Sequence, residues 1–269
     1  MKIGKYEFDF TNEAYIMGIL NVTPDSFSDG GHYNQVDNAL FRVQEMIDEG
    51  ATIIDIGGES TRPGYDMISD DEEVNRVVPV IEAIKNRFEV ALSLDTYKSY
   101  VASEGIKAGV HMINDIWGFK YDKKLPQVVK DNQVVCCLMH NRKEAVYNDF
   151  IKDVLADLQE SIDIAISAGI QKDKIILDPG VGFGKDYFHN LKMINECDKV
   201  CELGYPVLLG TSRKSVIGNT LNIPPEERGV GTAATTVLGY ERGCRIFRVH
   251  DIRTNLEALK MARAIITNS

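Results

Sequence analysis

Eight short apolar stretches of the sequence each end in residues whose side chains can bind a substrate or transfer a proton. These residues are Asn21, Glu59, Asp95, Asn114 with Asp115, His140, Asp178, Ser212 with Lys214, and Arg248 with His250. A helix N-cap would explain any one of them, and this reading is open for Asp115 and for Asp251. Eight caps at corresponding positions are a poor explanation, so the pattern predicts an active site.

Asp95 and Asp178 give the strongest support for this prediction. Each closes a stretch that is otherwise apolar, ALSLDT in one case and IILDPG in the other. Burying an unpaired carboxylate costs several kcal/mol. We therefore expect each of the two to have a partner that compensates for its burial.

Two segments between these stretches are unusually long for connections in an α/β protein. Val22–Tyr33 and Glu59–Asp70 exceed the roughly 2–6 residues that are typical, and both are rich in Gly, Pro, Ser and Asp. They also contain Phe27 and Arg62, which a bare linker does not need. The composition predicts lids that close over a substrate.

The elements that position these residues alternate along the chain. The apolar stretches are Tyr15–Asn21, Thr52–Gly58, Ala91–Thr96, Met112–Ile116, Val134–His140, Ile175–Gly180, Pro206–Ser212 and Cys244–His250. They are apolar on both faces, as parallel strands covered on both sides are. Helical periodicity marks Asp37–Glu49, Asp71–Phe88, Asp149–Ala168 and Thr254–Ile266.

Eight strand–helix units in 269 residues favour a closed barrel over an open sheet. The sequence therefore predicts an α/β protein with one domain over residues 1–269, a (β/α)8 TIM barrel. Ile3, Tyr6, Phe8 and Phe10 alternate with polar residues, which predicts an N-terminal β-hairpin that plugs the floor of the barrel. At the other end, polar residues at the carboxyl ends of the strands would share one mouth.

The composition excludes several classes of partner. A net charge of −10 argues against binding of nucleic acid or of an anionic membrane surface, but it leaves room for a small anionic substrate. The sequence begins without a signal-peptide pattern and holds no apolar run long enough to span a bilayer. Its five cysteines have no metal-ligand spacing. We expect a cytoplasmic protein with reduced thiols.

Several motifs resemble those of the dihydropteroate synthases. The matches are Gly18–Gly31 (GILNVTPDSFSDGG), Asp55–Gly64 (DIGGESTRPG), Leu94-Asp95, Ile113–Ile116 (INDI), Leu138–His140 (LMH), Asp178–Lys185 (DPGVGFGK), Ser212–Gly218 (SRKSVIG) and Arg248–Asp251 (RVHD). They run in the family's order from about Tyr15 to the end. Departures such as Tyr65, Trp117 and Val181 fall beside the polar positions.

The resemblance implies a reaction in folate biosynthesis. The family joins (7,8-dihydropterin-6-yl)methyl diphosphate to 4-aminobenzoate and releases diphosphate. It implies catalytic roles for Asp95, Asp178, Lys214 and Arg248, with the pterin diphosphate bound by these four together with Thr61, Asn114, Met139, Phe183, Val249 and His250. A carboxylate suits the paired N–H donors of the pterin, and an arginine suits phosphate oxygens.

The resemblance also implies a second binding region, a metal and an assembly. The lid and 4-aminobenzoate residues would be Phe27, Asp29, Thr61, Arg62, Pro63 and Ser215. The cofactor would be Mg²⁺ with Asn21 as its protein ligand, since this ion binds few protein oxygens besides substrate phosphates. A homodimer is a further family expectation. Two alternatives stay open: a pterin-dependent methyltransferase with the same barrel, and an inactive pterin-binding homologue.

Overall fold

The computed structural model describes residues 1–23, 32–59 and 67–267. Its main sheet contains eight parallel strands in the order β8-β7-β6-β5-β4-β3-β10-β9. The strands are β3 (Tyr15–Asn21), β4 (Ile53–Gly57), β5 (Ala91–Asp95), β6 (Met112–Asp115), β7 (Val135–Met139), β8 (Ile175–Asp178), β9 (Leu208–Leu209) and β10 (Ile246–Val249). A parallel bridge between Leu177 and Val207 joins β8 to the residue before β9. The two edges therefore meet, and the predicted (β/α)8 TIM barrel is confirmed.

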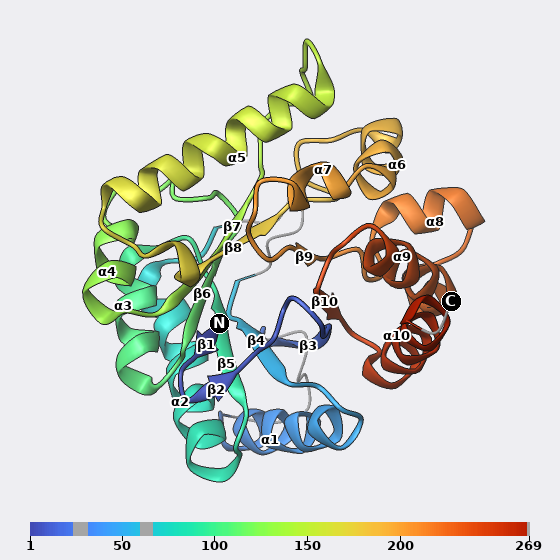
Figure 1. The fold of residues 1–269 in the computed structure, drawn as a ribbon. Coiled ribbons are helices and arrows are strands. Elements are labelled where there is room, and N and C mark those ends of the chain that lie inside the picture. Colours follow the sequence, from blue (N-terminus) through green and yellow to red (C-terminus); the bar gives the residue numbers. More distant parts are fainter. Residues whose placement is uncertain (24–31, 60–66, 268–269) are drawn as a thin grey trace.

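Helices surround the strands on the outside (Figure 1). They are α1 (His32–Asp48), α2 (Asp70–Arg87), α3 (Ser99–Ala108), α4 (Leu125–Asn132), α5 (Phe150–Ser167), α6 (Tyr187–Asn195), α7 (Asp198–Cys201), α8 (Ser215–Leu221), α9 (Gly229–Glu241) and α10 (Ile252–Thr267). Two short 3₁₀ turns lie at Lys172–Lys174 and Pro225–Glu227. The four helices expected from periodicity correspond to α1, α2, α5 and α10, although α1 begins five residues earlier than expected. At α5, the Asp149 side chain accepts the N–H of Lys152 and caps the first turn.

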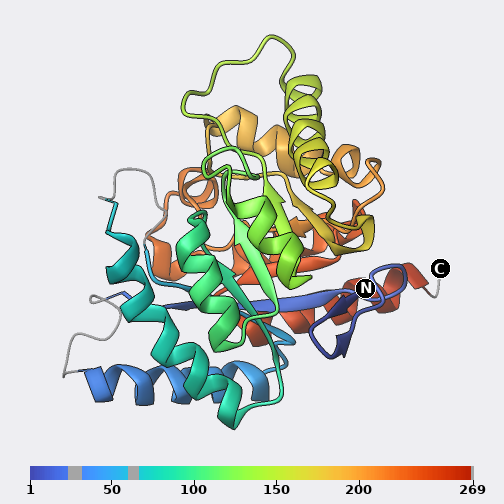
Figure 2. The ribbon, with the colours of Figure 1, turned by 90° about the vertical axis from the view of Figure 1, so that its left-hand side faces the viewer.

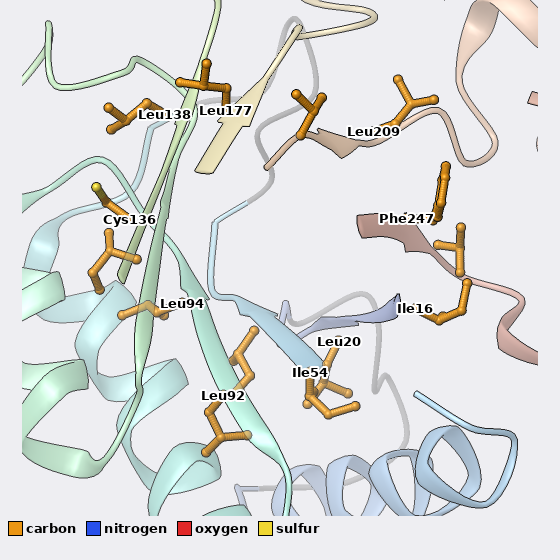
Figure 3. Close-up of a cluster of buried hydrophobic side chains, with 14 of the residues drawn as sticks. Ile16, Leu20, Ile54, Leu92, Leu94, Cys136, Leu138, Leu177, Leu209 and Phe247 are labelled. Atoms are coloured by element: carbon orange, nitrogen blue, oxygen red, sulfur yellow. The ribbon is translucent and has the colours of Figure 1, made fainter. Parts of the chain in front are cut away.

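One face of every strand packs against these helices. Side chains from alternate strand positions form a large apolar cluster with helix residues such as Val43, Ile81 and Leu158. Figure 3 labels ten members from the strands and shows them directed away from the interior of the barrel: Ile16, Leu20, Ile54, Leu92, Leu94, Cys136, Leu138, Leu177, Leu209 and Phe247. This layer is the main core of the molecule.

The opposite face of the strands forms a second, smaller cluster at the bottom of the barrel. It contains Met17, Ile53, Ala91, Met112, Val135, Cys137, Ile176, Leu208 and Ile246, and it includes Ile3 and Phe8 from the N-terminus. Strands β1 (Lys2–Ile3) and β2 (Tyr6–Glu7) pair antiparallel. In Figure 2 this hairpin lies at the end from which β3 starts. The predicted hairpin and its place at the floor are confirmed.

Candidate active site

The alternation of the strands decides which polar residues face the interior. Successive side chains in a strand point to opposite faces, so a residue two positions after a floor residue also points inward. The residues at this second level, or the next one, include Asn21, Asp55, Asp95, Asn114, Met139, Asp178 and Arg248. These side chains, most of which were expected from the strand ends, therefore share the interior of the barrel near its mouth.

Arg248 lies at the centre of one half of this interior. Its Nε donates to Asp55 Oδ2 at 2.6 Å, and its Nη2 donates to Asp95 Oδ2 at 2.7 Å. Asn114 Nδ2 donates to the same oxygen of Asp55 at 3.2 Å. Asp55 was absent from the residues predicted from the sequence, yet it is fully buried and orients both the guanidinium and the amide.

The electrostatics of this half are dominated by burial. Desolvation raises the pKa of Asp95 to about 7; Arg248 opposes the rise and the nearby charge of Asp55 adds to it. Burial acts against the charge on Arg248, but Asp55 and Asp95 outweigh it and raise its pKa. Asp55 Oδ1 and Asp95 Oδ1 have no hydrogen-bond partner among the described residues. Both oxygens are shielded from solvent. The partner expected for Asp95 is Arg248.

Asp178 and Lys214 form the other half. Asp178 Oδ1 accepts the backbone N–H of Gly180 at 2.7 Å. Burial raises the pKa of Asp178, and the cation of Lys214 opposes this rise. Burial likewise lowers the pKa of Lys214 to about 8, against the charge of Asp178. The partner expected for Asp178 is therefore Lys214, through charge, together with a backbone donor.

An apolar wall adjoins this pair. Met139 belongs to a small cluster with Tyr97 and Ile116, against which Trp117 and Phe183 pack. The Lys214 ammonium lies 4.6 Å from the centre of the Phe183 ring, within the range of a cation–π contact. A flat heterocycle with an N–H edge would find carboxylate and amide acceptors together with apolar faces here.

Two glycines keep the interior open. A Cβ on Gly57 would lie 3.8 Å from Asn21 Oδ1 and 3.9 Å from Asp95 Oδ2. A Cβ on Gly210 would lie 3.8 Å from Asp178 Oδ2. A Cβ at either position would touch these oxygens at van der Waals distance, so a larger side chain would crowd them.

Several strand-end residues face away from the interior. Asp251 accepts the N–H of Thr254 at 3.2 Å and caps the start of α10, as considered for it. Asp115 accepts the N–H groups of Trp117 and Phe119 at 2.8 and 2.6 Å within a turn, and no helix begins there. The Val249 side chain packs in the outer core. Only its backbone can contribute to a site.

His140 also lies behind the interior surface. Its Nε2 is 3.1 Å from Asp157 Oδ2 and its Nδ1 is 2.7 Å from Lys185 Nζ, and its side chain is fully buried. Burial lowers its pKa to about 4, so the imidazole is neutral at physiological pH. His250 is placed differently: its Nδ1 is 2.9 Å from Ser212 Oγ, which also accepts the His250 N–H at 3.1 Å.

A buried ionic cluster borders the second predicted lid. Lys98 Nζ pairs with Glu59 and, at 2.8 Å, with Glu73, and it donates to the carbonyl of Ile68 at 2.9 Å. Tyr97 OH donates to Glu59 Oε1 at 2.7 Å. Glu59, which was expected at the mouth, is thus bound to Tyr97 and Lys98, and its Oε2 also accepts the N–H of Ile68 at 3.4 Å.

Five of the predicted lid and 4-aminobenzoate residues lie outside the described residues: Phe27, Asp29, Thr61, Arg62 and Pro63. The sixth, Ser215, is exposed at the first position of α8, directly after Lys214. The predictions for these positions remain predictions.

The residues can be tested against the metal that the family resemblance implies. Within the described ranges, no group of three or more His, Cys, Asp and Glu side chains is arranged to hold a metal ion. Asn21 is exposed at the end of β3, and its Oδ1 faces the interior beside Gly57. This donor set fits an ion that arrives with most of its ligands, such as Mg²⁺ carried by a diphosphate.

Comparison with known proteins identifies the family. The model of the pterin-binding enzymes matches residues 17–250. A dihydropteroate synthase of Clostridium beijerinckii is 55% identical over 267 residues, which cover 99% of this chain and 99% of that protein. The chain belongs to the dihydropteroate synthase family. The resemblance found from the motifs is confirmed, and the comparison favours neither alternative.

Two solved structures of the family share its fold closely. The dihydropteroate synthase of Clostridium difficile, crystallised in the presence of pteroic acid, has a TM-score of 0.94 and 49% identity, with coverage of 96% of this chain and 99% of that one. The enzyme of Xanthomonas albilineans with 4-aminobenzoic acid has a TM-score of 0.91 and 40% identity, with coverage of 95% and 94%. No helix in the described part of the chain could cross a membrane.

Two residues that shape the family site were missed by sequence reasoning. Asp55 lies inside its strand rather than at the end, but its position two residues after Ile53 and two before Gly57 was an available signal. Lys185 appeared only as part of a motif. Nothing in its sequence neighbourhood distinguished it from a surface lysine.

Proposed function

We infer that this protein is a dihydropteroate synthase, which condenses (7,8-dihydropterin-6-yl)methyl diphosphate with 4-aminobenzoate and releases diphosphate. The observation that carries this inference is that Asp95, Asn114, Asp178, Lys214 and Arg248 lie together inside the barrel. The chain that holds them is 55% identical to the dihydropteroate synthase of Clostridium beijerinckii. The protein with Mg²⁺ and both substrates should release diphosphate and form 7,8-dihydropteroate. No diphosphate release from a folded preparation would refute the inference.

Asp178 and Asn114 are proposed to recognise the pterin ring. Asp178 Oδ2 lies beside Gly210, which has no side chain to cover it, and would accept the paired N–H donors of an aminopyrimidinone. Asn114 donates to Asp55, which leaves its carbonyl oxygen for a ring N–H. Lys214 supplies an N–H for a ring acceptor, while Met139 and Phe183 contact the ring faces.

Charge placement supports a dissociative displacement, in which the bond from the methylene carbon to the diphosphate oxygen breaks before the arylamine attacks. The bonding pair leaves with the diphosphate, and the pterin-stabilised cation lies near the carboxylates of Asp95 and Asp178. The 4-aminobenzoate nitrogen then donates its lone pair to the methylene carbon and loses a proton. No covalent nucleophile is required.

Arg248 and His250 are proposed to stabilise the departing diphosphate. In the structure, Arg248 is bound by Asp55 and Asp95 through Nε and Nη2. Its side chain retains one fifth of its exposure, so further N–H groups can reach a phosphate. The paired carboxylates fix the plane of the guanidinium before substrate arrives, which reduces the entropy cost of binding.

We propose that 4-aminobenzoate binds nearer the mouth than the pterin does. Phe27 and Pro63 would enclose its ring, with Thr61, Arg62, Asp29 and Ser215 beside it. Support comes from the sequence motifs and from Ser215, which is exposed directly after Lys214.

Mg²⁺ is proposed to enter with the diphosphate and to use Asn21 as its protein ligand. When bound, the ion would neutralise charge on the leaving group. Removing Mg²⁺ with a chelator should abolish turnover, and adding it back should restore the rate. Asn21→Ala should raise the Mg²⁺ concentration needed for calorimetric binding of the pterin diphosphate; an unchanged requirement would exclude Asn21 as a ligand.

We further propose a cytoplasmic homodimer in which residues 1–269 of each copy act as one domain. Phe188 on α6, Leu221 on α8 and Val230 on α9 are exposed apolar side chains on neighbouring helices, which suits a second copy. All five cysteines are free thiols, which suits a reducing compartment. Light scattering measures the assembly directly, and a monomer at assay concentration would refute it.

A further inference from the structure

The loop after β8 is shaped by close backbone contacts. We call residues 180–184 the glycine loop; its three glycines all have positive φ, between 53° and 88°. A Cβ on Gly180 would lie 1.8 Å from the carbonyl oxygen of His140, and one on Gly184 would lie 2.5 Å from that of Arg142. The glycine loop is therefore pressed against the chain that follows β7, where only glycine fits.

Lys185 holds this loop from behind. Its Nζ donates to the carbonyl oxygens of Gly180 at 2.9 Å and Phe183 at 3.1 Å, and it lies 2.7 Å from His140 Nδ1. An ammonium has three N–H donors, and here each finds one acceptor. The two carbonyls belong to the start and the end of the turn, so this single cation sets the width of the loop.

His140 connects the lysine to the barrel wall. Its Nδ1 accepts from Lys185, so its Nε2 carries the proton and donates to Asp157 on α5. Asp157 Oδ2 also accepts Nε of Arg142 at 2.6 Å. The lysine is thus anchored to the residues after β7 and to α5, both of which lie outside the reacting region.

The front of the glycine loop faces the proposed pterin pocket. The Val181 carbonyl accepts the Lys214 ammonium, and the Phe183 ring lies under the same cation. A Cβ added to Gly182 would lie 3.0 Å from Cδ of Lys214, so the loop also passes close to this side chain. A change in the loop would therefore move both the cation and the apolar face that the pterin contacts.

We propose that Lys185, fixed by His140 and Asp157, is a positioning residue that shapes the glycine loop and so places Val181, Phe183 and Lys214 for the pterin. This proposal rests on the proposed function for the identity of the ligand. Lys185 acts through the loop and touches no reacting atom.

The protonation of Lys185 gives the proposal a measurable signature. Burial lowers its pKa to about 7, and Asp178 opposes this effect. The other charged or titratable groups around it are His140, Arg142, Asp157 and Lys214. Below pH 7 the ammonium serves all three acceptors, whereas above it the neutral amine has only two N–H groups. Pterin affinity should therefore fall as the pH rises through 7.

The experiment compares wild type with Lys185→Met, which has a similar length but no donors. We expect the KM for the pterin diphosphate to rise on the order of tenfold, with the KM for 4-aminobenzoate unchanged within about twofold. The contribution of Lys185 to the pH dependence of pterin affinity near pH 7 should disappear, while the contributions of Asp95 near pH 7 and of Lys214 near pH 8 remain. Lys192→Met on α6 removes the same charge from an exposed position and should match wild type.

A purely structural role would lower the melting temperature and leave both KM values and the pH profile as in wild type, which would overturn the proposal. If Lys185→Met does not fold, His140→Asn tests the same chain of contacts, because it keeps an acceptor for Lys185 but loses Asp157. It should raise the pterin KM by a smaller factor, and an unchanged KM would overturn the proposal. Calorimetry with the pterin diphosphate needs no turnover, so an inactive wild type that still binds would count against the proposed function alone.

Discussion

Replacing Asp178 with Asn should weaken pterin binding through a change of one atom. Gly180 donates its N–H to Oδ1 of Asp178 at 2.7 Å. In the variant, the amide oxygen keeps this bond because a buried N–H needs an acceptor. The amide NH₂ must then occupy the position of Oδ2 beside Gly210. A pair of pterin donors would meet a donor in place of a carboxylate oxygen.

The magnitude follows from the two charge-assisted hydrogen bonds that are lost, at about 1.5–3 kcal/mol each. Since 1.4 kcal/mol is tenfold in affinity, Kd should rise by roughly 100-fold or more. The fluorescence of Trp117, the single tryptophan, reports binding because it packs on the same apolar cluster as Phe183. Calorimetry provides a second measurement.

The matched control is Asp186→Asn. Asp186 is exposed at the N-cap of α6, where its side chain accepts the N–H of His189 at 2.7 Å, and Asn is an equally good cap. It removes the same charge from a nearby position. Burial raises the pKa of Asp178, so the neutral variant should also remain folded. A folded Asp178→Asn protein with wild-type affinity would refute the assignment of Asp178 to the pterin edge.

Three other predictions follow from the same site. Asp55→Asn removes the charge of one of the two carboxylates that bind Arg248 and should lower the free energy of unfolding by roughly 3 kcal/mol, measured by urea denaturation; a change near zero would contradict its structural role. Pterin affinity should decrease as the pH rises through about 8, since Lys214 loses its proton there, and Lys214→Arg should move this decrease to higher pH. Phe27→Ala should spare pterin affinity and raise the KM for 4-aminobenzoate, whereas an equal loss for both substrates would contradict the lid prediction.

The barrel could be predicted from the sequence because each strand is an apolar run of similar length. The exception is β9, expected over Pro206–Ser212 but limited to Leu208–Leu209, because it lies at the seam where Leu177 and Val207 form only one bridge. Helix α9 could not be found from periodicity. Three of its four buried residues are Thr232, Thr236 and Gly239, and Thr236 donates to Asn255 at 2.7 Å. Tyr240 alone does not make an apolar stripe on the inner face.

The site was predicted in part for a related reason. A strand that is apolar on both faces does not reveal which positions point inward, so the last residue of each run was the available guide. This guide found Asp95 and Asp178, but it also included His140, whose side chain points toward α5. It missed Asp55, which is buried two residues before the end of β4. The lid residues depended on the family motifs alone.

Because side chains alternate between the two faces of each strand, an insertion within a strand changes which residues face the interior of the barrel. One residue inserted near the start of β8 would direct the Asp178 side chain toward the apolar core under the helices. It would direct the Leu177 side chain into the interior of the barrel. Inserting two residues would keep every side chain on its original face and would move the Asp178 carboxylate by one repeat of the strand toward the mouth. Length variation among relatives should therefore accumulate in the connections, while within strands it should occur in pairs or not at all.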